Sequence, residues 1–525
     1  MNMSMSPKDL KCGNRWLKFF RKWHRWPGVI MGFFFILWAI SGIVMNHRQL
    51  FSGFDISRKF LSREYRYVNW NNAAVKSAVT IGPDSLLIFG NIGIWLTDSN
   101  YASFKDFNAG FPKGIDNRKV SSMLVTKKGN VYAGTLFGLY HFDPLRGLWV
   151  KLNIPVNDER IQWLVEKDGE VLILTRSELL SAVDDPGKFS VEKLHLPPPE
   201  GYDNKASLFR TIWVIHSGEI YGFTGKLIVD ALGLILILLA ITGTLHFSMP
   251  YALRRRKKLK KSTVLASSTK RISAKWHKKA GIWIALFLLI NTITGMFLRP
   301  PLLIAIANSR VGMIPFSVLD TPNPWEDKLK AVIYDEDAGG FIFGTNEGLY
   351  FADKDLKQKM IALAGQPPLS VMGINVFEKS GPGRYLVGSF NGLYDWSPGD
   401  GVSPVGDSIS TKRDGVPLNN AIPFGDQMVS GYLKSETGKE VYFDYNRGAV
   451  ILTGTDEFPA MPLEIIKESP MSWWNFALEV HTGRIFKPLI YDFYILIVPL
   501  MGLFGTILVI SGLMVWIKLY ARKNH

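Results

Sequence analysis

The stretch Lys-Trp-His-Arg-Trp-Pro-Gly at residues 22–28 has a second version in this chain, Lys-Trp-His-Lys-Lys-Ala-Gly at residues 275–281. Each version opens a long apolar run. The two runs stay aligned without a gap as far as a Ser-Gly step at residues 41–42 and a Thr-Gly step at residues 294–295. An internal repeat determines the architecture of a chain. The repeat therefore predicts two tandem copies of one helical unit.

A second pair of matching stretches shows that the repeated unit is a pair of helices. Ile-His-Ser-Gly at residues 215–218 corresponds to Val-His-Thr-Gly at residues 480–483. Each leads into an apolar run, which ends in Thr-Gly at residues 242–243 or in Ser-Gly at residues 511–512. Four of the nine histidines therefore stand at equivalent places before four apolar runs.

The four apolar runs have the length of membrane spans. A bilayer core of about 30 Å needs about 20 apolar residues. The first run is longer than the signal-peptide core of about 7–15 residues, and it recurs inside the chain, so we expect it to be retained as an anchor. The predicted fold class is a membrane four-helix bundle of two helix-pair repeats, related by a pseudo-two-fold axis. The runs cover residues 26–45, 231–249, 280–298 and 493–516.

The net charge of +16 reflects topology. Residues 1–28, 251–280 and 517–525 together hold 22 basic residues and one acidic residue, whereas the remainder holds 39 basic and 44 acidic residues. Basic residues next to membrane spans mark cytoplasmic segments. We therefore expect a membrane protein with both termini in the cytoplasm. These basic residues lie beside the lipid bilayer, and the positive charge does not indicate a nucleic-acid partner.

The predicted domain boundaries follow from these spans. We expect cytoplasmic segments, four membrane helices and two periplasmic β segments. In order they are a tail with the first helix (1–48), a β segment (49–205), the second helix (206–250), a basic loop (251–275), the third helix (276–299), a β segment (300–470), the fourth helix (471–517) and a tail (518–525).

The two external segments share a phrase, Gly-Thr/Ser-x-x-Gly-Leu-Tyr, at residues 134–140, 344–350 and 388–394. Repeats at this kind of spacing, about 40–45 residues, suit four-stranded propeller blades. The phrase resembles the propeller repeats in sensor regions of bacterial two-component regulators. We expect one all-β, propeller-like body of about six to eight blades drawn from both segments. Two separate small β domains are the alternative.

The histidines predict two haem b sites. Facing imidazoles in a bundle core are the axial ligands that a low-spin haem needs. Cys12 is the only cysteine, so any haem is held non-covalently. The repeat pairs His24 with His277 on the cytoplasmic side and His216 with His481 on the external side. The Ser/Thr-Gly steps leave room for a ring, and in an antiparallel bundle they lie level with the other copy's histidines.

Further side chains are alternatives or helpers for these sites. His47 and His246 are alternative ligands, because each lies at a membrane boundary. His216 precedes its apolar run by 15 residues, which is about 22 Å of helix. This distance predicts that the external pair lies on helix extensions above the hydrocarbon, and it keeps His47 open as a substitute. Three basic residues near the external face are possible partners for haem propionates: Arg48, Arg299 and Arg484.

The histidine stretches and Ser/Thr-Gly steps resemble the PepSY-associated transmembrane family, which includes ferric-siderophore reductases of the inner membrane. The resemblance covers the four spans and implies two b haems that move electrons outward. It implies an oxidoreductase that reduces a periplasmic ferric complex, such as a ferric siderophore. The electron donor is a quinol or a cytoplasmic flavin or reductase. The β segments depart from the family's usual module, so a non-enzymatic periplasmic sensor or binding protein is the alternative function.

Overall fold

The computed structural model describes residues 7–156, 158–370, 372–406, 425–435, 438–453 and 457–519, with side chains from Arg15 onward. These residues form two compact units. The helical unit consists of Met1–Arg48, Lys205–Asp320 and Trp474–His525, and the β unit of Gln49–Asn204 and Thr321–Trp473. Both predicted β segments thus contribute to one unit, although residues 300–320 group with the helices instead.

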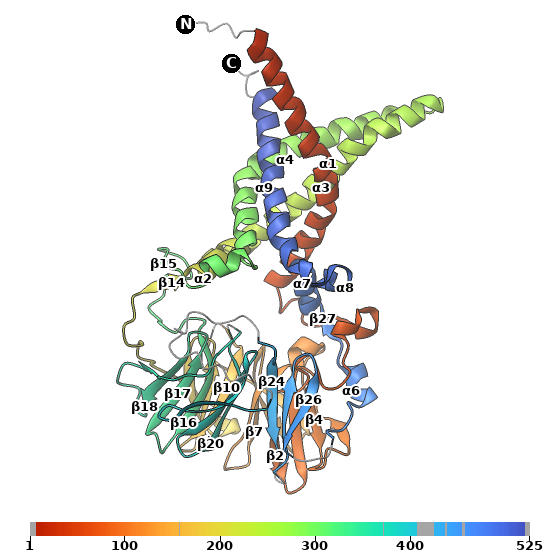
Figure 1. Cartoon of the computed structure of the whole chain (residues 1–525). Helices are drawn as coiled ribbons and strands as arrows, with labels where there is room; N and C mark the ends of the chain where they lie inside the picture. The colour runs from red at the N-terminus through yellow and green to blue at the C-terminus, as the bar shows by residue number, and fades with distance from the viewer. Residues whose placement is uncertain are drawn as a thin grey trace. The chain divides into compact units, whose positions relative to one another are not determined.

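Four long helices make up most of the helical unit (Figure 1). They are α1 (Pro7–Asn46), α3 (Gly222–Lys258), α4 (Val264–Phe297) and α9 (Ile497–Leu519). In the described part of the chain, four stretches are long and apolar enough to cross a membrane: Arg15–Asn46, Glu219–Lys258, Val264–Phe297 and Arg484–Leu519. A helix satisfies every backbone hydrogen bond internally, which is why such runs fold as helices in lipid.

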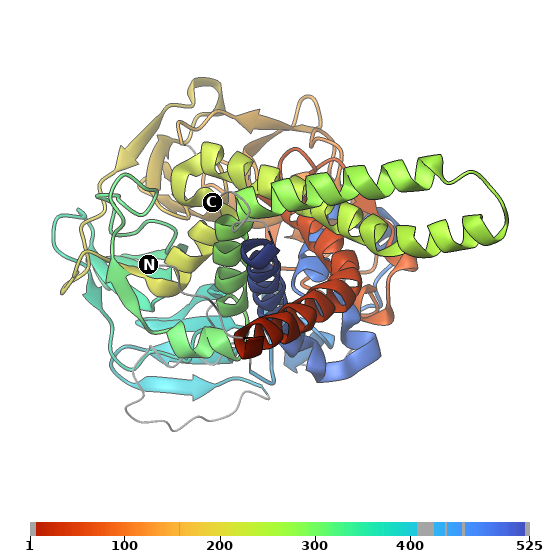
Figure 2. The same ribbon diagram turned by 90° about the horizontal axis from the view of Figure 1, so that it is seen from above.

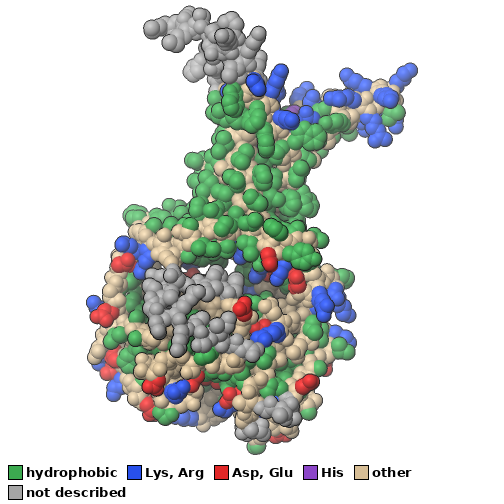
Figure 3. Space-filling model, in the orientation of Figure 1, with side chains coloured by type: hydrophobic (Ala, Val, Ile, Leu, Met, Phe, Trp, Pro, Cys, Tyr) green, Lys and Arg blue, Asp and Glu red, His purple; other side chains and the backbone are tan. Residues whose placement is uncertain are grey.

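The four helices contact one another in a ring, α1 with α3, α3 with α4, α4 with α9 and α9 with α1. Large apolar side chains cover the outside of this ring, as Figure 3 shows for one face. Trp283, for example, is 75 % exposed, which suits a lipid-facing position. The predicted four-helix arrangement of two helix pairs agrees with this unit.

The structure differs from the prediction in the basic loop and in the second and fourth helices. The basic segment 251–275 is mostly helical, because α3 continues to Lys258 and α4 begins at Val264. The connected ends of α3 and α4 project away from α1 and α9 (Figures 1 and 2). The second and fourth predicted helices are each broken. Four short helices accompany the long ones: α2 (Leu208–Ser217), α5 (Leu302–Ile306), α7 (Trp473–His481) and α8 (Lys487–Ile490).

The β unit is a series of small antiparallel sheets. The first β segment forms three four-stranded sheets in the described residues. They are β2 (Ser77–Gly82), β3 (Ser85–Gly90), β4 (Gly93–Thr97) and β5 (Phe104–Asp106); β6 (Val120–Val125), β7 (Val131–Thr135), β8 (Gly138–Asp143) and β9 (Leu148–Leu152); and β10 (Ile161–Lys167), β11 (Glu170–Thr175), β12 (Leu179–Val183) and β13 (Val191–Leu194).

The second β segment continues the series with two four-stranded sheets and one of three strands in the described residues. They are β16 (Leu329–Asp335), β17 (Gly340–Thr345), β18 (Leu349–Asp353) and β19 (Ile361–Ala362); β20 (Ile374–Gly381), β21 (Arg384–Ser389), β22 (Gly392–Ser397) and β23 (Gly401–Pro404); and β24 (Val429–Lys434), β25 (Glu440–Asp444) and β26 (Gly448–Thr453). Two-stranded pairs join β1 (Asp55–Ile56) to β27 (Met471–Ser472) and β14 (Lys205–Ser207) to β15 (Arg310–Gly312).

The first strands of the six larger sheets contact one another in the cyclic order β2, β6, β10, β16, β20, β24 and back to β2. The contacts from β10 to β16 and from β24 to β2 join the two β segments. Apolar clusters fill the spaces between sheets, and one of them packs Leu172 and Leu174 of the first segment against Phe341 and Phe343 of the second. The core of the β unit is therefore shared by both segments.

The recurring glycine phrase has a physical explanation. A Cβ on Gly344 would collide with Ile374 Cδ1 in the next sheet, so any larger residue would force the Ile374 side chain to shift where the sheets meet. Thr345 Oγ1 donates to Gly348 O at 2.8 Å and accepts from the Glu347 amide at 3.0 Å, which closes the turn. Gly348 adopts φ +138°, a conformation that favours glycine.

Candidate functional site

The first pair of predicted histidines lies in the core of the helical unit. His24 on α1 and His277 on α4 face each other with ring centres 6.0 Å apart. His24 Nδ1 lies 3.0 Å from Leu508 O and 3.1 Å from Ser511 Oγ, both on α9. His277 Nδ1 lies 3.1 Å from Leu239 O on α3. All four long helices therefore build the His24–His277 pair.

The second pair has the same geometry. His216, on α2, and His481, on α7, have ring centres 6.2 Å apart. His216 Nδ1 lies 3.1 Å from Asn291 O, and His481 Nδ1 lies 3.2 Å from Trp38 O. The structure thus brings together both pairs that the repeat predicts.

The His216–His481 pair does not lie on straight extensions of the long helices. Helix α2 ends at Ser217 and is followed by Gly218 with φ +79°, and His481 likewise ends α7, two residues before Gly483 with φ +73°. These left-handed glycines stop each helix directly after its histidine. The chain then turns before the next long helix, so the expected helical rise of about 22 Å does not apply.

Each imidazole is oriented in the same way. Its Nδ1 reaches a backbone carbonyl and also a Ser or Thr hydroxyl, at 3.0–3.2 Å. A carbonyl can only accept, so Nδ1 carries the proton. That tautomer leaves the Nε2 lone pair free for a metal, and such outer hydrogen bonds orient ligand histidines.

The four Ser/Thr-Gly steps receive the four histidines, and in every case the step belongs to the other copy of the repeat. A Cβ built on the glycine would lie 3.3 Å or less from the imidazole Cε1. Glycine at the step therefore allows the ring to pack against the helix backbone. The contacts are Gly512 with His24, Gly243 with His277, Gly295 with His216 and Gly42 with His481.

The two pairs lie far apart. On α1, His24 belongs to one pair, while Gly42, 18 residues later, touches His481 of the other. This separation is about 27 Å of helix. Each long helix that contributes to both pairs therefore links one end of the helical unit to the other.

The alternative histidines have different surroundings. His47 lies just beyond α1, and its Nε2 is 2.5 Å from Asp230 Oδ2 on α3. Among the described residues, no histidine ring pairs with either His47 or His246 at the short distances of the two pairs. The Asp230 partner was missed at the sequence level, although an aspartate beside an apolar run is a signal for such a role.

Of the three predicted arginines, Arg484 follows His481 by three residues, and Arg299 lies close enough to Arg484 for their charges to interact. Arg484 donates to Glu479, and its Nε is buried without a partner among the described residues. Burial lowers the pKa of Arg299, as does the nearby charge of Arg484. Glu479, which accepts from Arg484, supplies a negative charge near both cations. Arg48 instead lies 3.8 Å from the centre of the Trp474 ring.

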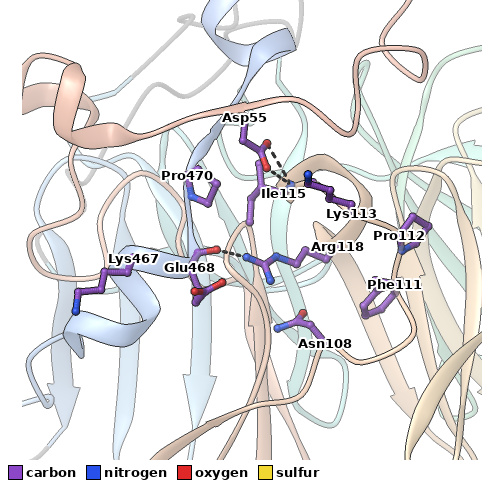
Figure 4. A pocket seen from close by; sticks show the side chains of 11 residues that line it. Asp55, Asn108, Phe111, Pro112, Lys113, Ile115, Arg118, Lys467, Glu468 and Pro470 are labelled. Atoms are coloured by element: carbon purple, nitrogen blue, oxygen red, sulfur yellow. Dashed lines mark hydrogen bonds between the residues drawn. The ribbon is translucent and has the colours of Figure 1, made fainter.

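The β unit holds a separate pocket of about 320 Å³ (Figure 4). It is lined in part by Asp55 of β1, by Arg118 of the short helix η3 (Ile115–Arg118) and by the end of α6 (Leu463–Glu468). Arg118 donates to the Glu468 carbonyl, and Asp55 accepts the Ile115 amide at 3.1 Å. Burial raises the pKa of Asp55. None of the predicted site residues lies in this pocket.

The fold and the histidine geometry define a class of membrane protein with two repeated helix pairs and two facing histidine pairs. The family model described as the PepSY-associated TM region matches residues 9–248 and 251–518, and the chain belongs to this family. The predicted membership is therefore confirmed. No curated protein matches the chain.

Solved structures resemble the chain only at low similarity. The extracellular domain of a putative hybrid two-component system from B. thetaiotaomicron is 10% identical, with a TM-score of 0.35, over 73% of this chain and 33% of that chain. PorZ of the type-IX secretion system of Porphyromonas gingivalis is 10% identical, with a TM-score of 0.33, over 72% of this chain and 38% of that chain. The chain thus spans about a third of the length of these proteins.

Proposed function

We propose that this chain is a transmembrane di-haem b electron-transfer protein that reduces a ferric complex, such as a ferric siderophore, on the external side. The observation that carries the proposal is the pair of facing imidazole sets, with ring centres 6.0 and 6.2 Å apart. With a metal–nitrogen bond of about 2 Å, two axial imidazoles have ring centres about 6.4 Å apart. Both pairs come within a few tenths of an ångström of this separation.

The surrounding residues also fit haem. Each Nδ1 is engaged by a carbonyl, which leaves Nε2 as the ligand atom, and the glycine steps keep the space beside each ring free of side chains. His24 and His277 would hold one haem, and His216 and His481 the other. Arg299 and the unpartnered Nε of Arg484 suit the propionates. A haem b held in this way supplies a one-electron Fe(III)/Fe(II) couple.

The chain's own residues then have positional roles. The hydrogen bonds to Nδ1 fix each ring and raise its basicity as a ligand. The apolar helix faces exclude water. Reduction releases iron from a hard oxygen chelator, because the lower charge of Fe(II) weakens those bonds. The sequence has no nucleotide-binding motif, so the donor is a quinol or a separate cytoplasmic flavoprotein or reductase.

We further propose that the β unit is a six-bladed propeller composed from both external segments, on the strength of the cyclic contact order of its six first strands. Each segment supplies three sheets, which are too few to close a ring. Expressed alone, residues 49–204 should therefore aggregate or remain unfolded. A stable monomer of that segment, seen by gel filtration and circular dichroism, would contradict the composite ring.

The decisive experiment is a reduced-minus-oxidised spectrum of the purified full chain, with haem counted per polypeptide. We expect about two haems per chain and sharp reduced bands from low-spin iron. Protein that has been reduced with dithionite and freed of the excess should also be reoxidised by a ferric chelate. A colourless chain with intact fold would contradict the proposal and favour a membrane-anchored sensor or binding protein.

A further inference from the structure

The proposed function leaves one hydrogen-bonded network of the helical unit without a role. His47 Nε2 lies 2.5 Å from Asp230 Oδ2, and Asn46 Nδ2 donates to Asp230 Oδ1 at 2.9 Å. The repeat does not require this network, because the aligned positions in the other copy are Pro300 and Ile495. Only one copy carries it.

The position of these ionisable groups, beside lipid, lowers the stability of the folded protein unless they are paired. Asp230 lies within the apolar stretch Glu219–Lys258, and the side chains of His47 and Asp230 are 18% and 11% exposed. An ionisable side chain beside lipid is destabilising unless it has a polar or charged partner, and such side chains usually serve a function. Hydrogen bonds from His47 and Asn46 satisfy both carboxylate oxygens, so the network is fully formed without a ligand.

The geometry is that of an oriented base. The Nε2–H of His47 donates to the Asp230 carboxylate, so in the neutral imidazole Nδ1 carries the lone pair. Among the described residues, no group is within hydrogen-bond distance of this Nδ1. A carboxylate behind an imidazole fixes its tautomer and stabilises the imidazolium that forms when the ring takes a proton. His47 is therefore ready to accept a proton from a hydroxyl.

The surroundings define what kind of hydroxyl can reach His47. The ring of Phe223 lies 6.1 Å from the His47 ring and is 66% exposed. Leu227 and Ile228, one turn further along α3, are 47% and 51% exposed. A ligand at this place has an acidic hydroxyl and an apolar body that dissolves in lipid.

The network also reaches the His216–His481 pair. Asn46 Nδ2 is 3.3 Å from the carbonyl of Ser217, the residue that follows His216. A group bound at His47 is thus connected through Asp230, Asn46 and Ser217 to a predicted haem ligand. A hydroxyl compound that gives up protons and electrons together would use both the base at His47 and this connection to the haem ligand.

We infer that His47 and Asp230 form the oxidation site for a membrane hydroquinone, which is the electron donor; this inference rests on the proposed function. The hydroquinone loses its two O–H protons and two electrons and becomes the quinone. Each proton passes to His47 Nδ1 and then to solvent. The oxidant would be the two haem irons of the proposed function, held by the two histidine pairs, and each Fe(III) would take one of the two electrons. His47 is the proton acceptor, and Asp230 is a positioning residue.

The kinetic test uses the full chain in nanodiscs and measures haem reduction by a short-chain ubiquinol. His47→Gln should slow this reduction by a factor of about 10²–10⁴, the usual contribution of a general base. Asp230→Asn should lower the maximal rate while the ubiquinol concentration for half-saturation changes little, and Asp230→Glu should restore part of it. The control is Tyr221→Phe, which removes an exposed hydroxyl near the same end of α3.

Dithionite must reduce both haems equally in all four variants. If His47→Gln loses a haem instead, His47 is a ligand and the inference is overturned. It is also overturned if ubiquinol fails to reduce the parent protein, or reduces parent and His47→Gln at equal rates.

A second measurement does not depend on haem. An azido-ubiquinone photolabel should modify the chain near His47 or Phe223, and His47→Gln should reduce this labelling. Such labelling supports the site even in a chain that binds no haem, so failure of the proposed function remains distinguishable. Labelling confined to other helices would overturn the inference.

Discussion

Replacement of single histidines tests the pairing of the two candidate haem sites. His24→Ala and His277→Ala should each remove the same haem or convert it to a high-spin form, because loss of either imidazole leaves five-coordinate iron. His216→Ala and His481→Ala should act on the other haem. The haem content of each variant should fall from about two to about one, or the low-spin signal should fall by about half.

The distance between the two histidine pairs predicts how many haems each double variant loses. The pairs are about 27 Å apart along α1, well beyond the distance of about 7–10 Å within which substitutions couple. His24→Ala/His277→Ala should therefore lose one haem only, whereas His24→Ala/His216→Ala should lose both. The assays are a pyridine haemochrome count and the low-spin electron paramagnetic resonance signal.

The same series has a clear contrary outcome. Four single variants that all keep two low-spin haems would refute the pairing, and His47 and His246 would then be the ligands to test. A His24→Ala variant that disturbs both haems equally would refute the independence of the sites. Ferric reductase activity driven by a reductant supplied on the cytoplasmic side should be lost in every single variant, even with one haem intact, because those electrons must pass both haems.

Three other predictions address the topology, the glycine steps and the β unit. Reporter fusions should place residue 265 in the cytoplasm and residues 120 and 390 outside, because basic residues flank the spans on one side; an external residue 265 would reverse every side assignment. Gly295→Ala should weaken the low-spin signal of one haem more than Gly42→Ala does, because the added Cβ would meet an imidazole carbon at 2.9 Å rather than 3.3 Å; equal effects would show that the steps do not set ring position. Burial raises the pKa of Glu378 to about 7, so the folded β unit favours the neutral acid. The neutral Glu378 carboxyl therefore contributes stability that is complete below the pKa of this group in the unfolded chain and is lost as the pH rises through about 7. Glu378→Gln should remove this pH dependence of thermal unfolding.

The helical unit was largely predictable from the sequence, because its determinants are local and repeated. A continuous apolar run of span length folds as a helix in lipid whatever its neighbours are. The repeat then predicted that His24 faces His277 and that His216 faces His481. It also predicted that each Ser/Thr-Gly step meets a histidine of the other copy, since symmetry imposes the same contact twice.

Other features depended on contacts between residues far apart in the chain. The turns at Gly218 and Gly483 place the second histidine pair on separate short helices, and a count of residues along one helix cannot anticipate such turns. The carbonyl partners of the histidines, Leu508 among them, carry no signal in the side-chain sequence because every residue has a carbonyl. The His47–Asp230 contact breaks the repeat, so symmetry could not reveal it.

The β unit likewise combines features that the local sequence determines with features that depend on contacts between distant residues. The Gly-Thr/Ser-x-x-Gly-Leu-Tyr phrase revealed a repeated sheet, because a turn needs its glycine locally at Gly348. Which sheet follows which was decided by packing, such as the contact of Ile374 with Gly344 in the neighbouring sheet. Local backbone geometry is therefore readable from one stretch of sequence. The order of sheets and the partners of buried polar groups arise only when distant stretches share a core, because their burial stabilises one arrangement of the whole chain.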